Sequence, residues 1–236
     1  MTWLEMLMGP RAPLPDVVEV VFRGALAEAG CPPREGQIRM ARAVAEAIDG
    51  TLVGSTGAPT PVLAVEAATG LGKGLGYLVP AVVAITRNRA FPPLGDSKRS
   101  KVIVSTANIA LQRQLVTKDV PMLARAMGIG ISVATMKGRS NYVCHEKMDV
   151  ESRIIGEHTS FVAGIRDWLA QGGSGDREDL PGVAAPRSWA RVSVSAEDCL
   201  GPQCPFAQQC IGNKVRREAE KAAVIVVNHS FLALAH

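Results

Sequence analysis

The chain has 236 residues, 47% of them hydrophobic, so it can bury the core of one or two domains. Its net charge of +4 permits an anionic partner without demanding one. Aromatic residues make up only 4%, too few for an extended base-stacking platform, and no apolar run reaches the roughly 18–20 residues of a membrane span.

The beginning of the chain lacks the features of a signal peptide. Met1–Pro15 is apolar but is interrupted by Glu5 and by prolines, and it has no basic leader. We therefore expect a cytoplasmic protein without a membrane anchor. Thiols stay reduced in that compartment, so clustered cysteines there suggest metal binding more than disulfides.

Helix and strand patterns alternate along the first part of the chain. Apolar residues at helical spacing predict a helix at Glu35–Ile48, and a short apolar run predicts a buried strand at Val62–Val65. The other elements expected here are a loop at Gly50–Pro61, a helix at Leu75–Ile85, a surface loop at Arg87–Ser100, a strand at Lys101–Ser105, a helix at Ala107–Ala126 and a strand at Ile131–Ala134.

This alternation is interrupted over residues 141–213, which hold four of the five cysteines, a helical piece around Ile154–Leu169 and a polar stretch at Gln171–Arg187. A strand pattern returns only at Ala222–Val227. Strands and helices on both sides of an interruption predict a parallel α/β domain with an insertion. The expected division is residues 1–140, an insertion at 141–213, and a return to the first domain at 214–236.

A glycine-rich run, E-A-A-T-G-L-G-K-G, occupies Glu66–Gly74 between the predicted strand and helix. Gly70 and Gly72 permit backbone angles closed to other residues, so successive N–H groups can point at phosphate oxygens. The following helix offers its positive end to an anion. Lys73 supplies a cation for the outer phosphates and is the expected catalytic residue. A purely structural turn is the alternative, but the strand–turn–helix context matches a phosphate-binding loop.

Gly74 departs from the usual loop, in which the lysine is followed by Ser or Thr and that hydroxyl binds Mg²⁺. Glycine has no side-chain oxygen. Either water substitutes, or Thr69 contributes, or hydrolysis is impaired.

Two polar side chains precede the loop in R-E-G-Q, Arg34 and Gln37, one helical turn apart. A Gln amide can bond both a donor and an acceptor on an adenine edge, although solvated helix surface is the alternative. The expected nucleotide-binding residues are Arg34, Gln37, Ala68, Thr69, Gly70, Leu71, Gly72, Lys73 and Gly74.

Four cysteines form one candidate metal site, with Cys144 far upstream of the C-x4-C-x5-C triplet Cys199, Cys204 and Cys210. Zinc favours two closely spaced pairs, and redox catalysis favours C-x-x-C, which is absent. An iron–sulfur cluster takes four thiolates and tolerates irregular spacing. Four unrelated buried thiols are the remaining alternative.

Together these motifs resemble the iron–sulfur helicases of superfamily 2, the DinG/XPD group, and most closely the bacterial DinG type. The resemblance covers about residues 30–236. It is carried by R-E-G-Q at 34–37, E-A-A-T-G-L-G-K at 66–73, S-T-A-N-I-A-L-Q-R-Q-L at 105–115, K-G-R-S-N-Y-V-C at 137–144, the cysteine triplet, and A-V-I-V-V-N-H-S-F-L at 223–232.

The resemblance implies part of a RecA-like parallel-sheet motor domain with an inserted [4Fe-4S] domain, and ATP-driven 5′→3′ movement on single-stranded DNA. Arg34 and Gln37 would bind adenine, the loop would bind ATP with Mg²⁺, and the four cysteines would hold the cluster. Residues near DNA would be Thr106, Gln112, Lys137 and Arg139. Thr106 could instead cap the next helix, and Lys137 and Arg139 could be solvated turn charges.

The family's acidic D-E-A-H-type box and second motor domain are not found before His236. We therefore expect a chain that is not a competent helicase alone and needs that C-terminal motor domain in cis or a partner in trans. Two alternatives stay open: a non-hydrolysing single-stranded DNA-binding or recruitment module, and a zinc-stabilised NTP-binding regulator.

Overall fold

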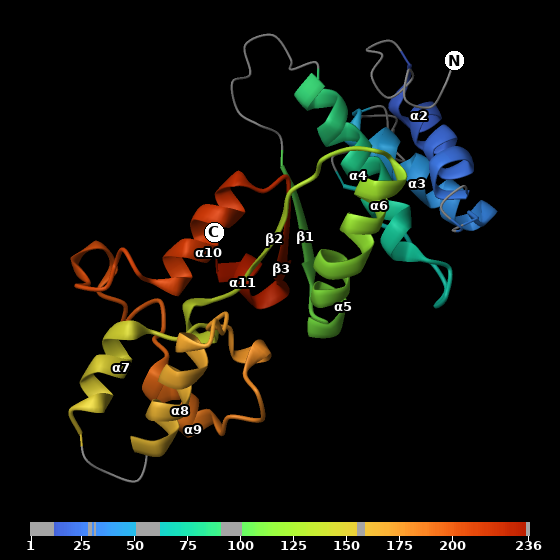
Figure 1. Cartoon of the computed structure of the whole chain (residues 1–236). Coiled ribbons are helices and arrows are strands. Elements are labelled where there is room, and N and C mark those ends of the chain that lie inside the picture. Colours follow the sequence, from blue (N-terminus) through green and yellow to red (C-terminus); the bar gives the residue numbers. More distant parts are fainter. Residues whose placement is uncertain are drawn as a thin grey trace. The chain divides into compact units, whose positions relative to one another are not determined.

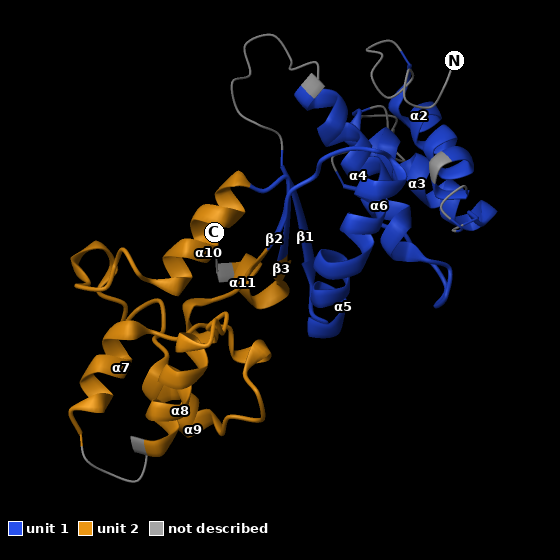
Figure 2. Cartoon of the chain, viewed as in Figure 1, with its two compact units in different colours: residues 1–134, 222–226 blue, residues 135–221, 227–236 orange. Residues whose placement is uncertain are grey.

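A computed structural model gives the fold and describes residues 12–27, 30, 32–50, 62–90, 101–154 and 159–234. The chain divides into two compact units (Figure 2). Unit 1 comprises Met1–Ala134 with Ala222–Val226, and unit 2 comprises Thr135–Lys221 with Val227–His236. The insertion boundaries expected at 141 and 213 stay a prediction.

A small parallel sheet of three strands runs in the order β1–β3–β2 (Figure 1). Its strands are β1 (Val102–Thr106), β2 (Val133–Met136) and β3 (Val224–Asn228). The central strand β3 is buried over its V-I-V-V run, as expected for a parallel strand covered on both faces. The predicted α/β class with a parallel sheet is confirmed.

Unit 1 surrounds its part of the sheet with helices. These are α2 (Leu14–Val21), which continues through the π-helical turn η1 (Phe22–Leu26), α3 (Glu35–Ile48), α4 (Lys73–Ala90), α5 (Ile109–Gln114), the π-helical turn η2 (Leu115–Asp119), and α6 (Val120–Ala126). Buried aliphatic side chains of these helices form one core with residues of β1 and β3. Val79, Val82 and Val83 of α4 lie in that core, so the helix that begins at the phosphate loop is anchored along its length.

Helices α3 and α4 pack closely because small residues lie where they meet. A side chain at Gly76 of α4 would place its Cβ 2.8 Å from Met40 Sδ. A side chain at Gly36 of α3 would place its Cβ 3.0 Å from Leu71 Cδ1. The start of α3 and the phosphate loop are therefore held against each other.

Unit 2 is built from short elements: η3 (Arg139–Asn141), α7 (His145–Ser152), α8 (Thr159–Ala170), η4 (Arg177–Asp179), α9 (Pro186–Val192), η5 (Gly201–Gln203), α10 (Ile211–Lys221) and α11 (His229–Leu234). Its core is formed by Val143, Met148, Val162, Ile165, Ala184, Trp189 and Val192. Trp189 donates a hydrogen bond from its indole N–H to the Ser140 carbonyl at 2.7 Å, which fixes α9 to the start of the unit.

Several element predictions need correction. Residues 62–65 are not a strand; they belong to a segment without regular structure that leads into the loop. The helix expected over Ala107–Ala126 begins at Ile109 and contains η2. Residues 87–90, expected in a loop, extend α4, while 91–100 and the loop residues 51–61 lie outside the described residues. Ile154 follows the end of α7 and is not helical.

Other elements agree with the sequence. The helix at Glu35–Ile48 is confirmed at both ends. The strands expected near residues 101, 131 and 222 are present as β1, β2 and β3 with ends shifted by one or two residues. Across the described residues, no helix is both long and apolar enough to cross a membrane.

Candidate nucleotide and cysteine sites

The glycine-rich loop of unit 1 has the backbone that its sequence predicts. Gly70 and Gly72 adopt φ values of +79° and +83°, which other residues rarely take. The loop leads directly into α4, whose first residue is Lys73. Most of the loop is exposed, so its N–H groups and the N-terminus of α4 are open to an anion.

Arg34 and Gln37 both bind the loop itself. The Arg34 guanidinium donates to the Gly70 carbonyl, and Gln37 Nε2 donates to the Gly72 carbonyl at 2.8 Å. A Cβ at Gly72 would overlap Gln37 Nε2. The side chain of Gln37 is buried, so the amide predicted to read a base is used here to fix the phosphate loop.

Lys73 and Gly74 occupy the turn where α4 starts. Lys73 Nζ donates to the Ala67 carbonyl at 2.9 Å, inside the loop, and its side chain is exposed. Gly74 has the carboxylate of Asp119 beside it: an added Cβ would lie 3.7 Å from Asp119 Oδ2. The structure thus brings together every predicted residue of the loop and adds one acid that the motif did not indicate.

Of the four predicted DNA contacts, one lies at the end of β1 and one on the helix that follows it. Thr106 is the last residue of β1, and its Oγ1 accepts from the Asn108 N–H at 3.1 Å. The helix cap is Asn108, whose Oδ1 accepts from the Leu111 N–H at 3.1 Å, so the capping role considered for Thr106 is wrong. Gln112 is only 2% exposed, and no described residue forms a hydrogen bond with its Nε2.

Lys137 was predicted to be either a DNA contact or a solvated charge, and the structure buries it. Its side chain is 7% exposed, and Nζ pairs with Asp176 at 2.6 Å and Glu178 at 2.9 Å. The cation is therefore already matched by two carboxylates. In this structure Lys137 fastens η4 to the beginning of unit 2.

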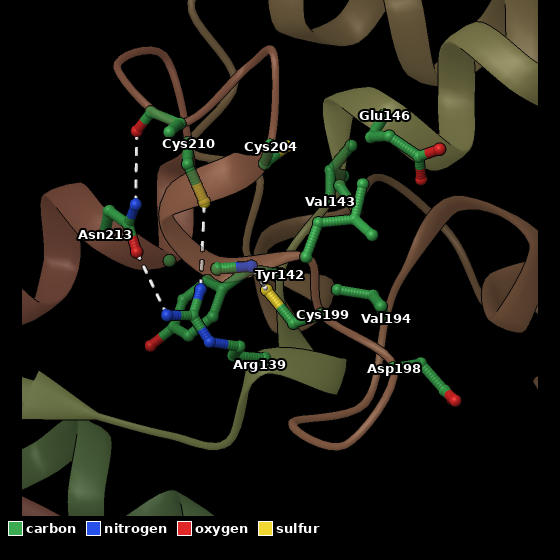
Figure 3. Close-up of a pocket in the computed structure, with 15 residues that line it drawn as sticks. Arg139, Tyr142, Val143, Glu146, Val194, Asp198, Cys199, Cys204, Cys210 and Asn213 are labelled. Atoms are coloured by element: carbon green, nitrogen blue, oxygen red, sulfur yellow. Dashed lines mark hydrogen bonds between the residues drawn. The ribbon is translucent and has the colours of Figure 1, made fainter.

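The four predicted metal ligands line one pocket of unit 2 (Figure 3). The pocket contains about 510 Å³ of space between atoms, part of it open to solvent. Cys144 comes from the start of α7, and Cys199, Cys204 and Cys210 come from the loop before α10. All four are half-buried and free of disulfides. The triplet lies between α9 and α10, in a segment whose regular structure among the described residues is the short turn η5.

Backbone N–H groups lie at two of the four thiols. Burial raises the pKa of the Cys144 thiol, and the backbone N–H groups of Lys147 and Glu146, at the start of α7, act against that rise. The Gly201 N–H donates to Cys199 Sγ at 3.4 Å. Such N–H groups stabilise a thiolate, which is the form that binds a metal.

Arg139 is the predicted site residue that joins the cysteine pocket. Its guanidinium lies between two acceptors in Figure 3, Cys210 Sγ at 3.9 Å and Asn213 Oδ1 at 3.0 Å. Asn213 in turn donates from Nδ2 to the Ala207 carbonyl at 3.1 Å. Arg139 is thus neither a solvated charge nor simply beside the cysteines, because it contacts one of their sulfurs.

Within the described residues, no group of three or more His, Cys, Asp and Glu side chains could hold one metal ion. In a four-iron cluster each thiolate binds a different iron, so the sulfurs stand farther apart than around one zinc. Four free thiols lining one pocket, with N–H donors at three of them, fit such a cluster.

Sequence reasoning missed Asn213 and Asp119. Asn213 lies three residues after Cys210, and its role follows only from the fold of the loop before α10. No motif surrounds Asp119. The available signal was its position on the buried face of a predicted helix, where a charged residue is unusual.

Comparison with known proteins gives one class. No family model matches the chain. The similar curated proteins are named ATP-dependent helicases. The chain is 38% identical over 233 residues to the helicase DinG of Mycobacterium tuberculosis. This alignment covers 89% of the chain and 32% of that protein.

Two further relatives agree. The helicase YoaA of Escherichia coli is 38% identical over 218 residues, covering 89% of this chain and 31% of the relative. The helicase DinG of Salmonella choleraesuis is 30% identical over 222 residues, covering 86% and 29%. The chain therefore spans about a third of the length of these relatives. The predicted resemblance to DinG-type helicases is confirmed.

Proposed function

We propose that this chain is the ATP-binding and cluster-bearing part of an ATP-dependent DNA helicase of the DinG type, built on part of a RecA-like domain. One observation carries the proposal. The loop with Gly70 and Gly72 in the left-handed conformation is tied to Arg34 and Gln37, in a chain whose relatives are ATP-dependent helicases.

Nucleotide binding follows from the loop. Its N–H groups and the start of α4 receive the phosphates, and the Lys73 ammonium exchanges the Ala67 carbonyl for outer phosphate oxygens. Gln37 binds the Gly72 carbonyl, so a base contact by its amide and the position of the phosphate loop are coupled.

The cysteines of unit 2 would hold a [4Fe-4S] cluster. When bound, this group supplies metal–thiolate bonds that tie the start of α7 to the loop before α10. The chain's own residues orient the ligands: Gly201 donates to Cys199, and Arg139, held by Asn213, donates to Cys210. We propose that Arg139 positions Cys210 as well as lying near the DNA path.

The proposed partners are single-stranded DNA, ATP and a second motor domain in the same polypeptide or in another subunit. Phosphoryl transfer of this class uses an arginine that reaches the nucleotide from a facing domain. Movement in the 5′→3′ direction belongs to the same proposal. Of the four residues predicted near DNA, Thr106 and Arg139 are half-buried, whereas Gln112 and Lys137 are buried.

A specific observation supports a second candidate function. Gly74 has no hydroxyl to ligate magnesium, which favours a module that binds ATP and single-stranded DNA without turnover. The two candidates differ in hydrolysis alone.

The experiment measures binding and turnover separately. We expect a fluorescent ATP analogue to bind the chain, and Lys73→Ala to weaken that binding by about tenfold or more. We also expect the fluorescence anisotropy of labelled single-stranded DNA to rise when the chain is added. Iron and sulfide analysis with the visible spectrum tests the cluster. Turnover is measured with the second motor domain supplied in cis or in trans: DNA-stimulated phosphate release then supports the motor, and binding without release supports the module. A folded protein that binds no nucleotide would refute both.

A further inference from the structure

The carboxylate of Asp119 lies beside the phosphate loop at the position where the loop's sequence departs from its usual pattern. Asp119 ends η2, and an added Cβ at Gly74 would be 3.7 Å from its Oδ2. In the usual loop that Cβ carries the hydroxyl that binds magnesium. An oxygen is thus present next to the position of the missing one, supplied by a different helix.

The position of this carboxylate is fixed by its neighbour. Gln114 Nε2 donates to both carboxylate oxygens, at 3.3 Å and 3.0 Å. The two residues are five apart, and the π-helical turn between them carries Asp119 at its end. Single π-helical turns inside α-helices frequently occur at functional sites.

The charge on Asp119 lacks a cation. Its side chain is 8% exposed, and no Lys, Arg or His in the described part of the chain forms an ion pair with it. Tyr77, one turn after Gly74 on α4, has its pKa raised by burial and by the charge of Asp119, so its phenol stays neutral. A buried carboxylate without a counterion is costly, and a cation that binds beside it removes that cost.

Magnesium fits this arrangement. It is usually held by one or two carboxylates together with substrate phosphates and water, not by a full protein cage. The loop places the phosphates, Gly74 leaves the space, and Asp119 provides the oxygen. We propose that Asp119 replaces the hydroxyl missing at position 74 and ligates the magnesium ion that accompanies ATP, directly or through one water. This inference rests on the proposed nucleotide-binding function.

The competing role for Asp119 is structural. A carboxylate near the start of α4 interacts favourably with the positive end of that helix. In that case Asp119 would stabilise the fold equally with and without nucleotide, and it would not contribute to the effect of Mg²⁺ on nucleotide affinity.

The test compares nucleotide affinity with and without magnesium. A fluorescent ATP analogue is titrated into the full chain in excess Mg²⁺ and in EDTA. We call the ratio of the affinity in Mg²⁺ to the affinity in EDTA the magnesium gain, and we expect it to be about tenfold or more in the unchanged chain. Asp119→Asn should reduce this gain to near one and leave the affinity in EDTA unchanged or higher. Bound Mn²⁺, measured by electron paramagnetic resonance, should fall in parallel. Asp16→Asn, on α2 and paired with Arg42, is the matched acid-to-amide control and should change neither value.

A second variant keeps the inference testable if Asp119→Asn fails to fold. Gly74→Thr restores the usual hydroxyl in a chain that keeps Asp119. If Asp119 already ligates the ion, the magnesium gain changes by less than about twofold. If the ion lacks a protein ligand, the hydroxyl should increase the gain by about tenfold. In the Asp119→Asn background the same threonine should restore the lost gain.

These outcomes distinguish a failure of the role of Asp119 from a failure of nucleotide binding. A gain that survives Asp119→Asn, or a tenfold rise with Gly74→Thr alone, overturns the role of Asp119 and leaves nucleotide binding standing. Equal loss of thermal stability with and without nucleotide, together with an unchanged magnesium gain, assigns the structural role. A folded chain that binds no nucleotide in either buffer overturns the proposed function, and this inference falls with it.

Discussion

The two units differ in how much of their folding rests on apolar burial. Unit 1 has an extended core drawn from α2, α3, α4, α6 and two strands, and its phosphate loop lies against the start of α3, which contributes to that core. Among the described residues of unit 2, the apolar core is a small cluster under α7, α8 and α9. Its four cysteines lie in a loop and at a helix start, outside that cluster.

This difference separates two ways of making a binding site. A site on a finished core keeps its shape without ligand, so binding there should alter folding little. Small apolar cores rarely suffice alone, and disulfides or metals commonly complete them. The cysteine site should therefore belong to the folding of unit 2, while the phosphate loop is an addition to a stable unit 1.

The largest expected effect comes from removing one cluster ligand. Cys204→Ser, or treatment with an iron chelator, should abolish the visible absorbance and make unit 2 sensitive to protease while unit 1 survives, because metal binding there is folding energy. Iron content, the spectrum and mass spectrometry of the protected fragments measure this. Cys31→Ser, at the cysteine outside the set, is the control. Loss of both units together would contradict the comparison.

The sequence could predict the features that are local in the chain. The spacing of Ile38, Ala41 and Ala45 fixes α3 because each lies on one helical face, and all three are buried. Gly70 and Gly72 were predictable because only glycine takes their backbone angles easily. The cysteine set was predictable as a group because Cys199, Cys204 and Cys210 fall within twelve residues, and the structure brings them to one pocket with Cys144.

What depends on distant partners could not be read from the sequence. Lys137 resembles a solvated basic residue, and its burial depends on Asp176, 39 residues away. Apolar residues at 62–65 satisfy a strand pattern, yet a strand needs a neighbour that pattern does not specify. Helical periodicity over Ala107–Ala126 does not distinguish a π-helical turn from an α-helix. The proximity of the Asp119 carboxylate to Gly74 therefore could not be predicted.

The next largest effect concerns the small core of unit 2. Trp189→Ala removes a buried indole and its hydrogen bond to the Ser140 carbonyl, at a cost of about 3–5 kcal/mol in the free energy of unfolding. We expect unit 2 to unfold and release iron. Leu26→Ala in unit 1 costs about 2–5 kcal/mol by the same kind of truncation. It should lower the melting temperature of unit 1 and leave iron in place, as followed by calorimetry with iron analysis.

A smaller effect is expected at Lys137. Lys137→Met leaves Asp176 and Glu178 without their cation, which destabilises unit 2. The cost should fall below the about 3–5 kcal/mol of fully buried pairs, since these side chains are 17% and 30% exposed. Affinity for single-stranded DNA, measured against salt concentration, should keep its slope. A slope reduced by about one would mean that Lys137 contacts a phosphate, contrary to the buried pairs.

The smallest effect on folding is expected at Gly72 of the phosphate loop. Gly128, which follows α6, is the matched control for backbone strain without a role in the loop. Gly72→Ala and Gly128→Ala both place a side chain at positive φ, +83° and +61°, which costs about 1–2 kcal/mol. Nothing lies within 4 Å of an added Cβ at Gly128, whereas at Gly72 the Cβ meets Gln37 Nε2 and displaces the amide that fixes the loop. Urea unfolding should therefore show a small loss for both variants, larger for Gly72→Ala by about 0.5–1.5 kcal/mol because it also breaks the Gln37 hydrogen bond. Nucleotide titration should show about a tenfold loss of affinity for Gly72→Ala alone. Equal affinities in the two variants would mean that the bond from Gln37 does not shape the phosphate site, and unit 1 would then owe its binding to the glycine backbone only.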